Sequence, residues 1–180
     1  DLQRAGALDF SFALAKGRGR YVCPARLDTL VRSSSGDDAQ IALVEEPLNL
    51  SPDAVQFYRA LSAGWSDSSW AGDRDSWPEA IPDGRWALAT TDHHQCSGRR
   101  CSYVSQCPFF TARAGLEAAD CVVANHDLVL ADIALGGGAV LPAPEDSIYI
   151  FDEAHHLPDK ACAHWSFQTR IGLAREQLAE

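Results

Sequence analysis

The most informative segment of the chain is SIYIFDEAH, residues 147–155. It begins with a continuously apolar run from Ser147 to Phe151, which is typical of a parallel β-strand covered on both faces. Two carboxylates, Asp152 and Glu153, follow this run directly. Ligands gather at the carboxyl ends of strands in parallel α/β sheets. The segment therefore predicts that the last third of the chain belongs to the α/β sheet of a nucleotide-binding domain.

The two carboxylates have the chemistry that phosphate cleavage needs. An aspartate at a strand end, here Asp152, can hold Mg²⁺ on nucleotide phosphates, and Glu153 can orient and deprotonate the attacking water. His155 would couple this site to a neighbouring segment, whereas His156 receives no task. The alternative interpretation is a solvated turn. No Gly-x-x-x-x-Gly-Lys-Ser/Thr phosphate loop occurs in the 180 residues, so we expect no ATP hydrolysis by this segment alone.

Upstream, the periodicity predicts mostly helices. Residues 2–16 form one amphipathic pattern, Pro24 opens a second, and Ser51-Pro52 is an N-cap signal for a third, with Val55, Tyr58 and Leu61 on its buried face. Residues 33–38 are expected to form a loop, residues 63–80 a loop-rich but packed segment containing three tryptophans, and residues 109–119 a further helix. A short strand at 121–124, a helix around 128–130 and a Gly136–Gly138 turn precede the SIYIF run.

Six cysteines suggest a metal site. Cys96, Cys101 and Cys107 lie within twelve residues, and the last of them precedes a proline at a predicted helix start, as Cys23 also does. Helix N-termini favour thiolates, so Cys23 is the best candidate for a fourth ligand. One remote and three local cysteines are typical of iron–sulfur clusters, although zinc stays open.

Other potential ligands are weaker. The adjacent histidines at 93 and 94 could serve zinc but are more typical of a surface. Cys121 and Cys162 are expected to be inert, buried packing residues.

The overall composition is that of a globular domain: 46% of the residues are hydrophobic and 22% are charged. The net charge of −10 argues against a simple electrostatic nucleic-acid binder. No signal peptide or membrane span is recognisable, which favours a reducing compartment and metal-bound rather than disulfide-bonded cysteines. The absence of methionine suggests a piece of a longer protein.

Four sequence motifs occur in the same order as in one known protein family. They are the Tyr21-Val22-Cys23-Pro24 entry, the Cys96, Cys101 and Cys107-Pro spacing, residues 120–126 (DCVVANH), and residues 152–157 (DEAHHL). The chain thereby resembles the DinG branch of the XPD-like superfamily 2 DNA helicases, over most of its length.

The resemblance implies an α/β fold: part of a RecA-like helicase motor domain, with a mostly helical iron–sulfur domain inserted. Residues 1–22 and 109–180 would belong to the first motor domain, with motif II at 152–155, and residues 23–108 would form the cluster domain. It implies that Cys23, Cys96, Cys101 and Cys107 hold a [4Fe–4S] cluster. Asp152 and Glu153 would be the magnesium and water-activating residues of the DEAH motif.

The same resemblance implies a function. The whole protein would be a 5′ to 3′ DNA helicase that uses ATP and Mg²⁺, acting in repair or replication on single-stranded and forked DNA. It would work in the bacterial cytoplasm at the nucleoid, with no membrane involvement. Two alternatives are a structural zinc module without catalytic role and a redox-sensing DNA-binding module. Metal identity distinguishes the first alternative, and DNA affinity in the two redox states tests the second.

Overall fold

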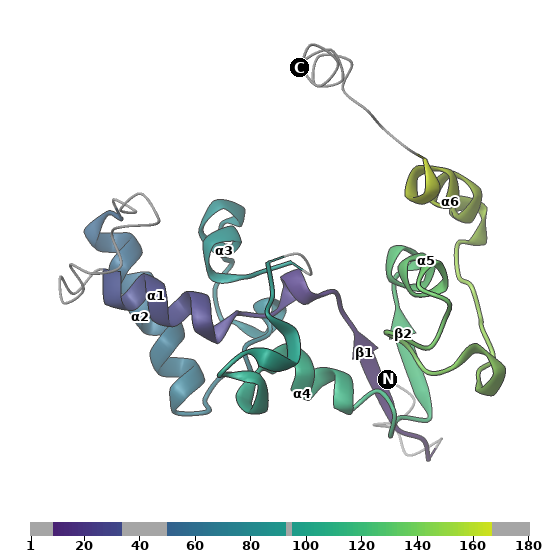
Figure 1. Cartoon of the computed structure of the whole chain (residues 1–180), viewed down its shortest axis with the longest axis horizontal. Helices are drawn as coiled ribbons and strands as arrows, with labels where there is room; N and C mark the ends of the chain where they lie inside the picture. The colour runs from purple at the N-terminus through teal and green to yellow at the C-terminus, as the bar shows by residue number, and fades with distance from the viewer. Residues whose placement is uncertain (1–8, 34–49, 93–94, 167–180) are drawn as a thin grey trace, which may run out of the picture. The chain divides into compact units, whose positions relative to one another are not determined.

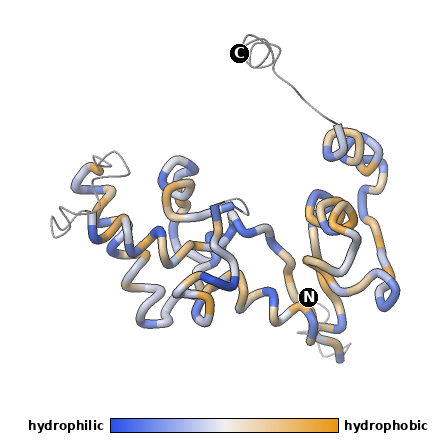
Figure 2. Tube along the Cα trace, viewed as in Figure 1, coloured by the Kyte–Doolittle hydropathy of each residue, from blue (hydrophilic) through white to orange (hydrophobic). Residues whose placement is uncertain are grey.

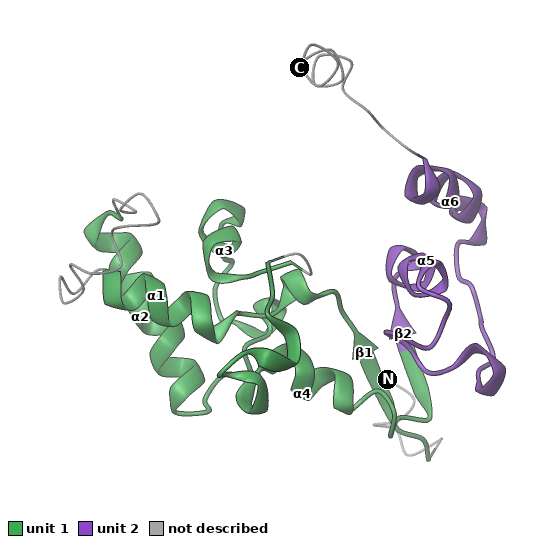
Figure 3. Ribbon diagram, viewed as in Figure 1, with its two compact units in different colours: residues 1–122 green, residues 123–180 purple. Residues whose placement is uncertain are grey.

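The computed structural model describes residues 9–33, 50–92 and 95–166. The chain divides into two compact units, residues 1–122 and 123–180 (Figure 3), and each is described by itself. Together they form a mixed helix and strand structure with one small sheet. None of the described helices has the length and apolar character that a membrane crossing requires.

The first unit is mostly helical, and its helices and strands are labelled in Figure 1. They are β1 (Phe12–Ala15), α1 (Pro24–Ser33), α2 (Pro52–Ser66), α3 (Asp83–Ala89), α4 (Pro108–Ala114) and the first half of β2 (Cys121–Ala124). Short 3₁₀ turns lie at Arg18–Arg20, Arg74–Ser76, Gly98–Arg100 and Val104–Gln106. Helix α1 packs against both α2 and α3.

The helix predicted for residues 2–16 is wrong where the structure describes it. Phe12–Ala15 is the strand β1, which runs parallel to β2 in a two-stranded sheet (Figure 1). The amide of Cys121 donates to the Ser11 carbonyl at 3.1 Å, and the Asp120 carboxylate accepts from both the backbone and the hydroxyl of Ser11. These pairings to a segment more than a hundred residues away outweigh the local helical pattern. Residues 2–8 lie outside the described residues.

Both predicted helix starts in this unit are confirmed. Pro24 is the first residue of α1, and the Ser51 hydroxyl accepts the Ala54 amide at the start of α2. Along α2, Tyr58 and Leu61 are buried as predicted, whereas Val55 is half-buried. The predicted loop at 33–38 falls almost wholly outside the described residues.

The tryptophan-rich segment is packed, as predicted. Trp70 is buried and meets Trp77 edge-to-face at 4.9 Å and Trp86 at 6.4 Å between ring centroids. The Trp86 indole donates to the Gly19 carbonyl at 2.6 Å. Trp70 and Trp86 belong to a core whose other buried members come from α1, α2, α3 and the residues just before α1 and α3: Val22, Leu27, Leu30, Ala54, Tyr58, Leu61, Ile81 and Ala89.

Helix α4 is shorter than the predicted span of 109–119. It ends at Ala114, with Gly115 at the C-cap position. Glycine lacks the side chain that favours continuing a helix, which accounts for the early end. Leu116 is nevertheless buried, as the helical pattern had indicated.

The second unit contains the end of β2, then α5 (His126–Ala134) and α6 (Leu157–Trp165), with 3₁₀ turns at Pro144–Asp146 and Ala154–His156. Helix α5 mixes strongly apolar with acidic residues (Figure 2) and packs against α6. The predicted strand at 121–124 and the following helix are confirmed, and the Asn125 side chain caps α5 by accepting the Leu128 amide. The predicted turn at Gly136–Gly138 is confirmed, with all three glycines at positive φ.

The strand predicted at Ser147–Phe151 is wrong for this structure. No strand is assigned there, and Ile148 and Ile150 are 93% and 92% exposed. Tyr149 stacks on Phe151, whose ring lies beside His126. A parallel strand requires a hydrogen-bonded neighbour, and none of the described residues pairs with this run.

Candidate metal centre and carboxylate site

Cys23 is held from both sides by backbone hydrogen bonds. Its amide donates to the Ala89 carbonyl at 2.8 Å, and its carbonyl accepts the Leu27 amide at 2.9 Å in the first turn of α1. Burial raises the pKa of the Cys23 thiol, although backbone N–H groups of Arg26 and Ala25 hydrogen-bond the sulfur and act in the opposite direction. The start of α1 therefore presents a half-buried sulfur with N–H groups directed at it, as a thiolate ligand requires.

The other three predicted ligands lie on two consecutive 3₁₀ turns. The Cys101 amide closes the first turn on the Gly98 carbonyl at 3.1 Å, and the Cys107 amide closes the second on the Val104 carbonyl at 3.3 Å. Cys96 precedes the first turn, and its sulfur accepts the Gly98 amide at 3.3 Å. All three cysteines are half-buried and unoxidised. These turns place the three thiols on one loop without a regular helix or strand.

The fold brings the remote cysteine into the neighbourhood of this loop. The thiolates of Cys101 and Cys96 both contribute to the raised pKa of Cys23, because like charges at close range oppose ionisation. On the side of Cys107, the next residue Pro108 packs with Val22 around Gly72. Four half-buried thiols from two distant parts of the sequence thus share one unit. Four thiolates are the donor set that an iron–sulfur cluster needs, whereas the three donor atoms found within 4.8 Å of one another among the described residues belong to Glu153, His155 and His156 rather than to cysteines.

Arg18 also contacts this group. Its guanidinium donates to Cys96 Sγ at 3.1 Å and lies 3.9 Å from the centroid of the Phe109 ring. The ring, itself edge-to-face with Tyr21 at 6.0 Å, fixes the plane of the guanidinium. Arg18 thus places a positive charge beside the Cys96 sulfur. An arginine five residues before Cys23 was the available sequence signal.

The predicted carboxylate site lies in the second unit. Asp152, Glu153 and His155 are all exposed, and the Asp152 carboxylate accepts the Glu153 amide at 2.9 Å. Glu153 has a left-handed backbone with φ of 50°, which few non-glycine residues adopt. Such conformations recur at functional positions. Since the preceding run is not a strand here, the expected placement at a strand end is not found.

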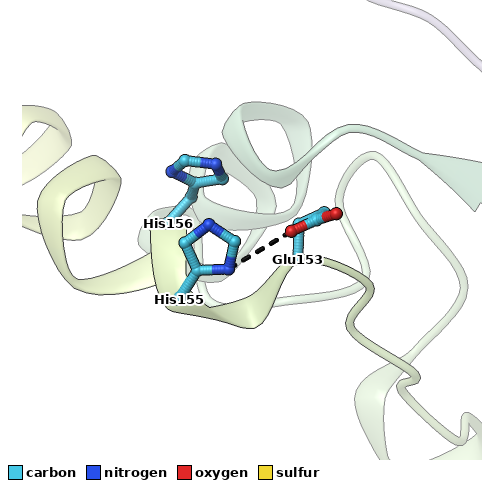
Figure 4. Close-up of side chains that lie close together, drawn as sticks. All are labelled: Glu153, His155 and His156. Atoms are coloured by element: carbon cyan, nitrogen blue, oxygen red, sulfur yellow. Dashed lines mark ion pairs between the residues drawn. The ribbon is translucent and has the colours of Figure 1, made fainter.

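Glu153, His155 and His156 form a compact group in the 3₁₀ turn (Figure 4). The His155 Nδ1 lies 3.2 Å from Glu153 Oε2, and the two imidazole centroids are 4.0 Å apart. One donor atom from each residue lies within 4.8 Å of the other two. Nitrogen and oxygen donors of this kind suit a divalent cation. The sequence had given His156 no task, yet the structure places it in this group.

The prediction that Cys121 and Cys162 are buried packing residues is wrong. Cys121 and Cys162 are both exposed. Cys121 lies on the outward-facing register of β2, where alternate residues are exposed, and α6 leaves Cys162 on its open side. The alternative zinc ligands at positions 93 and 94 lie outside the described residues.

The chain was compared with protein-family models and with curated proteins. The protein-family model DEAD_2 matches residues 91–172, a span that contains three of the four predicted cysteine ligands and the carboxylate site.

The chain is also similar to curated relatives named "ATP-dependent DNA helicase DinG". It is 45% identical over 153 residues to the protein of Photobacterium profundum, 41% over 154 residues to that of Salmonella typhimurium, and 40% over 154 residues to that of Escherichia coli (strain K12). Each match covers 85% of this chain and 21% of the relative. The chain thus spans about a fifth of the length of these relatives, and the resemblance to DinG-type helicases drawn from the motifs is confirmed.

Proposed function

We propose that this chain is the part of an ATP-dependent DNA helicase that carries a [4Fe–4S] centre and the DEAH motif. The observation that carries the proposal is that Cys96 and Cys101 lie close enough to Cys23 to act on its ionisation, with Arg18 and the Gly98 amide donating to the Cys96 sulfur. The similarity to relatives named as ATP-dependent DNA helicases, over 85% of this chain, supports the proposal.

In this proposal the metal centre organises an inserted, mostly helical domain at residues 23–108. Residues 1–22 and 109–180 contribute to a RecA-like motor domain. The centre ties the start of α1 to the loop before α4, so that its binding free energy becomes folding free energy of the insertion. When bound, the cluster supplies a redox-active group within the insertion, and the residues of this chain provide the thiolates and their hydrogen bonds.

The carboxylates perform the second role. Asp152 would hold Mg²⁺ on the ATP phosphates, because hard cations prefer carboxylate oxygen, and Glu153 would orient and deprotonate the attacking water. His155, in contact with Glu153, would keep that carboxylate in position. Hydrolysis would drive unwinding of single-stranded and forked DNA in the 5′ to 3′ direction, at the nucleoid in the bacterial cytoplasm. The phosphate loop must come from outside these 180 residues.

The metal assignment is tested by anaerobic purification of the full-length protein, followed by iron and zinc analysis and visible absorption. We expect about four irons per chain and broad absorption near 400 nm. Replacing Cys23 or Cys101 by Ser should abolish both signals. The exposed Cys162 offers a matched control, since Cys162→Ser should retain them. One zinc and no colour would instead support the structural zinc module.

The carboxylate assignment is tested in the same full-length protein by DNA-stimulated ATPase and strand-displacement assays. Asp152→Asn and Glu153→Gln should each lower ATP turnover at least about a hundredfold, as loss of a general base or metal ligand does. Asp146→Asn, an exposed aspartate of the same unit, is the control. Turnover retained in either motif variant would refute the assignment. Displacement of duplexes with a 5′ tail but not a 3′ tail would establish the polarity.

A further inference from the structure

Gly72 occupies a position between the two arms of the candidate metal centre. Its backbone has φ of +81°, and a Cβ atom built on it would lie 2.5 Å from Pro108 Cγ, 2.8 Å from Pro108 Cβ and 3.1 Å from Val22 Cγ1. Val22 directly precedes Cys23, and Pro108 directly follows Cys107. The absence of a side chain at residue 72 therefore allows the two cysteine-bearing segments to approach each other.

The backbone around Gly72 has little freedom to move away. The Gly72 carbonyl accepts the Val22 amide at 2.9 Å, and the next residue, Asp73, forms an isolated antiparallel bridge with Tyr21. On the other side, the indole of the buried Trp70 donates to the Asp73 carbonyl at 2.9 Å. Lys16 further holds the Asp73 carboxylate at 2.5 Å. A side chain at 72 would consequently displace Pro108 rather than its own backbone.

Displacing Pro108 would move a predicted metal ligand. Pro108 is the first residue of α4 and Cys107 is its N-cap, whose carbonyl accepts the Thr111 amide at 2.9 Å. Ordinary contact begins at 3.4 Å, so the 2.5 Å approach requires a shift close to 1 Å. Metal–ligand bonds tolerate deviations of only about 0.2 Å. A shift of that size would take the Cys107 sulfur out of bonding range.

We propose that Gly72 is a positioning residue for the metal centre: it sets the separation between Cys23 and Cys107. The inference rests on the proposed four-cysteine centre and adds to it a residue that provides no ligand. Gly72 contacts the two segments and not the metal, so its effect passes through Pro108.

The test uses the full-length protein, purified anaerobically, with iron content, visible absorption and tryptophan fluorescence measured for each variant. Gly72→Ala should lower the iron content from about four per chain to below one, with the tryptophan emission unchanged because Trp70 and Trp86 stay buried. Gly136→Ala is the matched control: it also has positive φ, of +100°, but nothing lies within 4 Å of its added Cβ. That variant should keep its iron.

A rescue variant separates positioning from general damage. Pro108→Gly removes both atoms that clash most closely, so Gly72→Ala combined with Pro108→Gly should regain the iron that Gly72→Ala loses. Iron retained in Gly72→Ala, iron lost equally in Gly136→Ala, or no recovery in the double variant would each overturn the inference. If Gly72→Ala does not fold, the iron content of the double variant is the test: recovered iron supports the inference, and absent iron overturns it. A wild-type protein without metal would refute the proposed centre itself, which is a different result.

Discussion

Replacing Asp132 by alanine should loosen the loop that follows α5. Asp132 is 1% exposed, and its carboxylate accepts three backbone amides: Gly138 on Oδ2 at 3.0 Å, and Val140 and Leu141 on Oδ1 at 2.5 and 3.3 Å. This single side chain satisfies the N–H groups of a glycine-rich turn that makes no regular structure. Without the carboxylate, the amides at the half-buried Val140 and the buried Leu141 would have no comparable acceptor.

The expected loss of loop stability depends on how many of these three hydrogen bonds water cannot replace. A hydrogen bond to a charged group contributes about 1.5–3 kcal/mol. Gly138 is exposed, so water can take its amide, and the other two bonds share one oxygen and are not additive. We therefore expect Asp132→Ala to lower the free energy of opening of this loop by about 3 kcal/mol. At 1.4 kcal/mol for each factor of ten, amide exchange there should accelerate on the order of a hundredfold.

Hydrogen exchange followed by mass spectrometry on peptides covering residues 136–142 measures this effect. Asp132→Asn keeps an oxygen for Val140 and Leu141 and loses only the bond to Gly138, so its exchange should lie between wild type and Asp132→Ala. Asp146→Ala, an exposed aspartate of the same unit, should leave exchange unchanged. Wild-type protection in Asp132→Ala would refute the argument that this carboxylate holds the loop.

Two further predictions concern the first unit. Arg18→Gln should lower the reduction potential of the proposed cluster, because the cation that contacts Cys96 favours the more negative reduced state. The expected decrease is about 40 mV, the one-electron equivalent of about 1 kcal/mol. An unchanged midpoint potential in an EPR-monitored titration would contradict this prediction. The hydrogen bond from Lys16 lowers the pKa of Asp75. This contact therefore stabilises the fold at pH values above the ordinary pKa of an aspartate, and the stabilisation is lost as the pH falls through the lowered pKa. Asp75→Asn should therefore flatten the acid side of the stability profile in thermal unfolding, and an unaltered profile would exclude the contact as its source.

Local signals predicted the helix starts correctly because the chemistry is local. The hydroxyl of Ser51 reaches an amide three residues away, and Pro24 has the fixed backbone angle that suits the first residue of α1. Likewise, the left-handed turn after α5 follows from three consecutive glycines, which adopt positive φ without steric cost. These elements depend on residues within a few positions of one another.

The two strand errors have a common physical origin. The segment Phe12–Ala15 was predicted as helix because its apolar spacing fits one, yet Ser11 pairs with Cys121, a contact that no local pattern reveals. The run at 147–151 has strong β-forming residues, but a strand also needs a neighbour, and the described residues supply none. In both cases the partner, rather than the segment, determines the outcome.

The four cysteine ligands stay a prediction from the sequence, whereas the residues that contact them could not be predicted at all. The spacing of Cys96, Cys101 and Cys107 indicated three of the thiols, and the proline that follows Cys23 at a helix start indicated the fourth. Arg18 and Gly72 carry no such signal, because their roles depend on which side chains the fold places beside them: a sulfur at 3.1 Å and a proline ring at 2.5 Å from a missing Cβ. Whether the carboxylates act as predicted is a matter for the ATPase assay.

The distribution of burial in the first unit explains why a metal would be placed here. The buried core draws its members from Val22 to Ala89, whereas none of the described residues between 95 and 107 is buried. A segment with no fully buried side chain gains less from the hydrophobic effect to offset its conformational entropy. Its three cysteines are the groups through which it could be tied to Cys23. A bound metal would thus provide the stabilisation that packing does not provide in this segment. It would also join the segment to the hydrophobic core of the first unit.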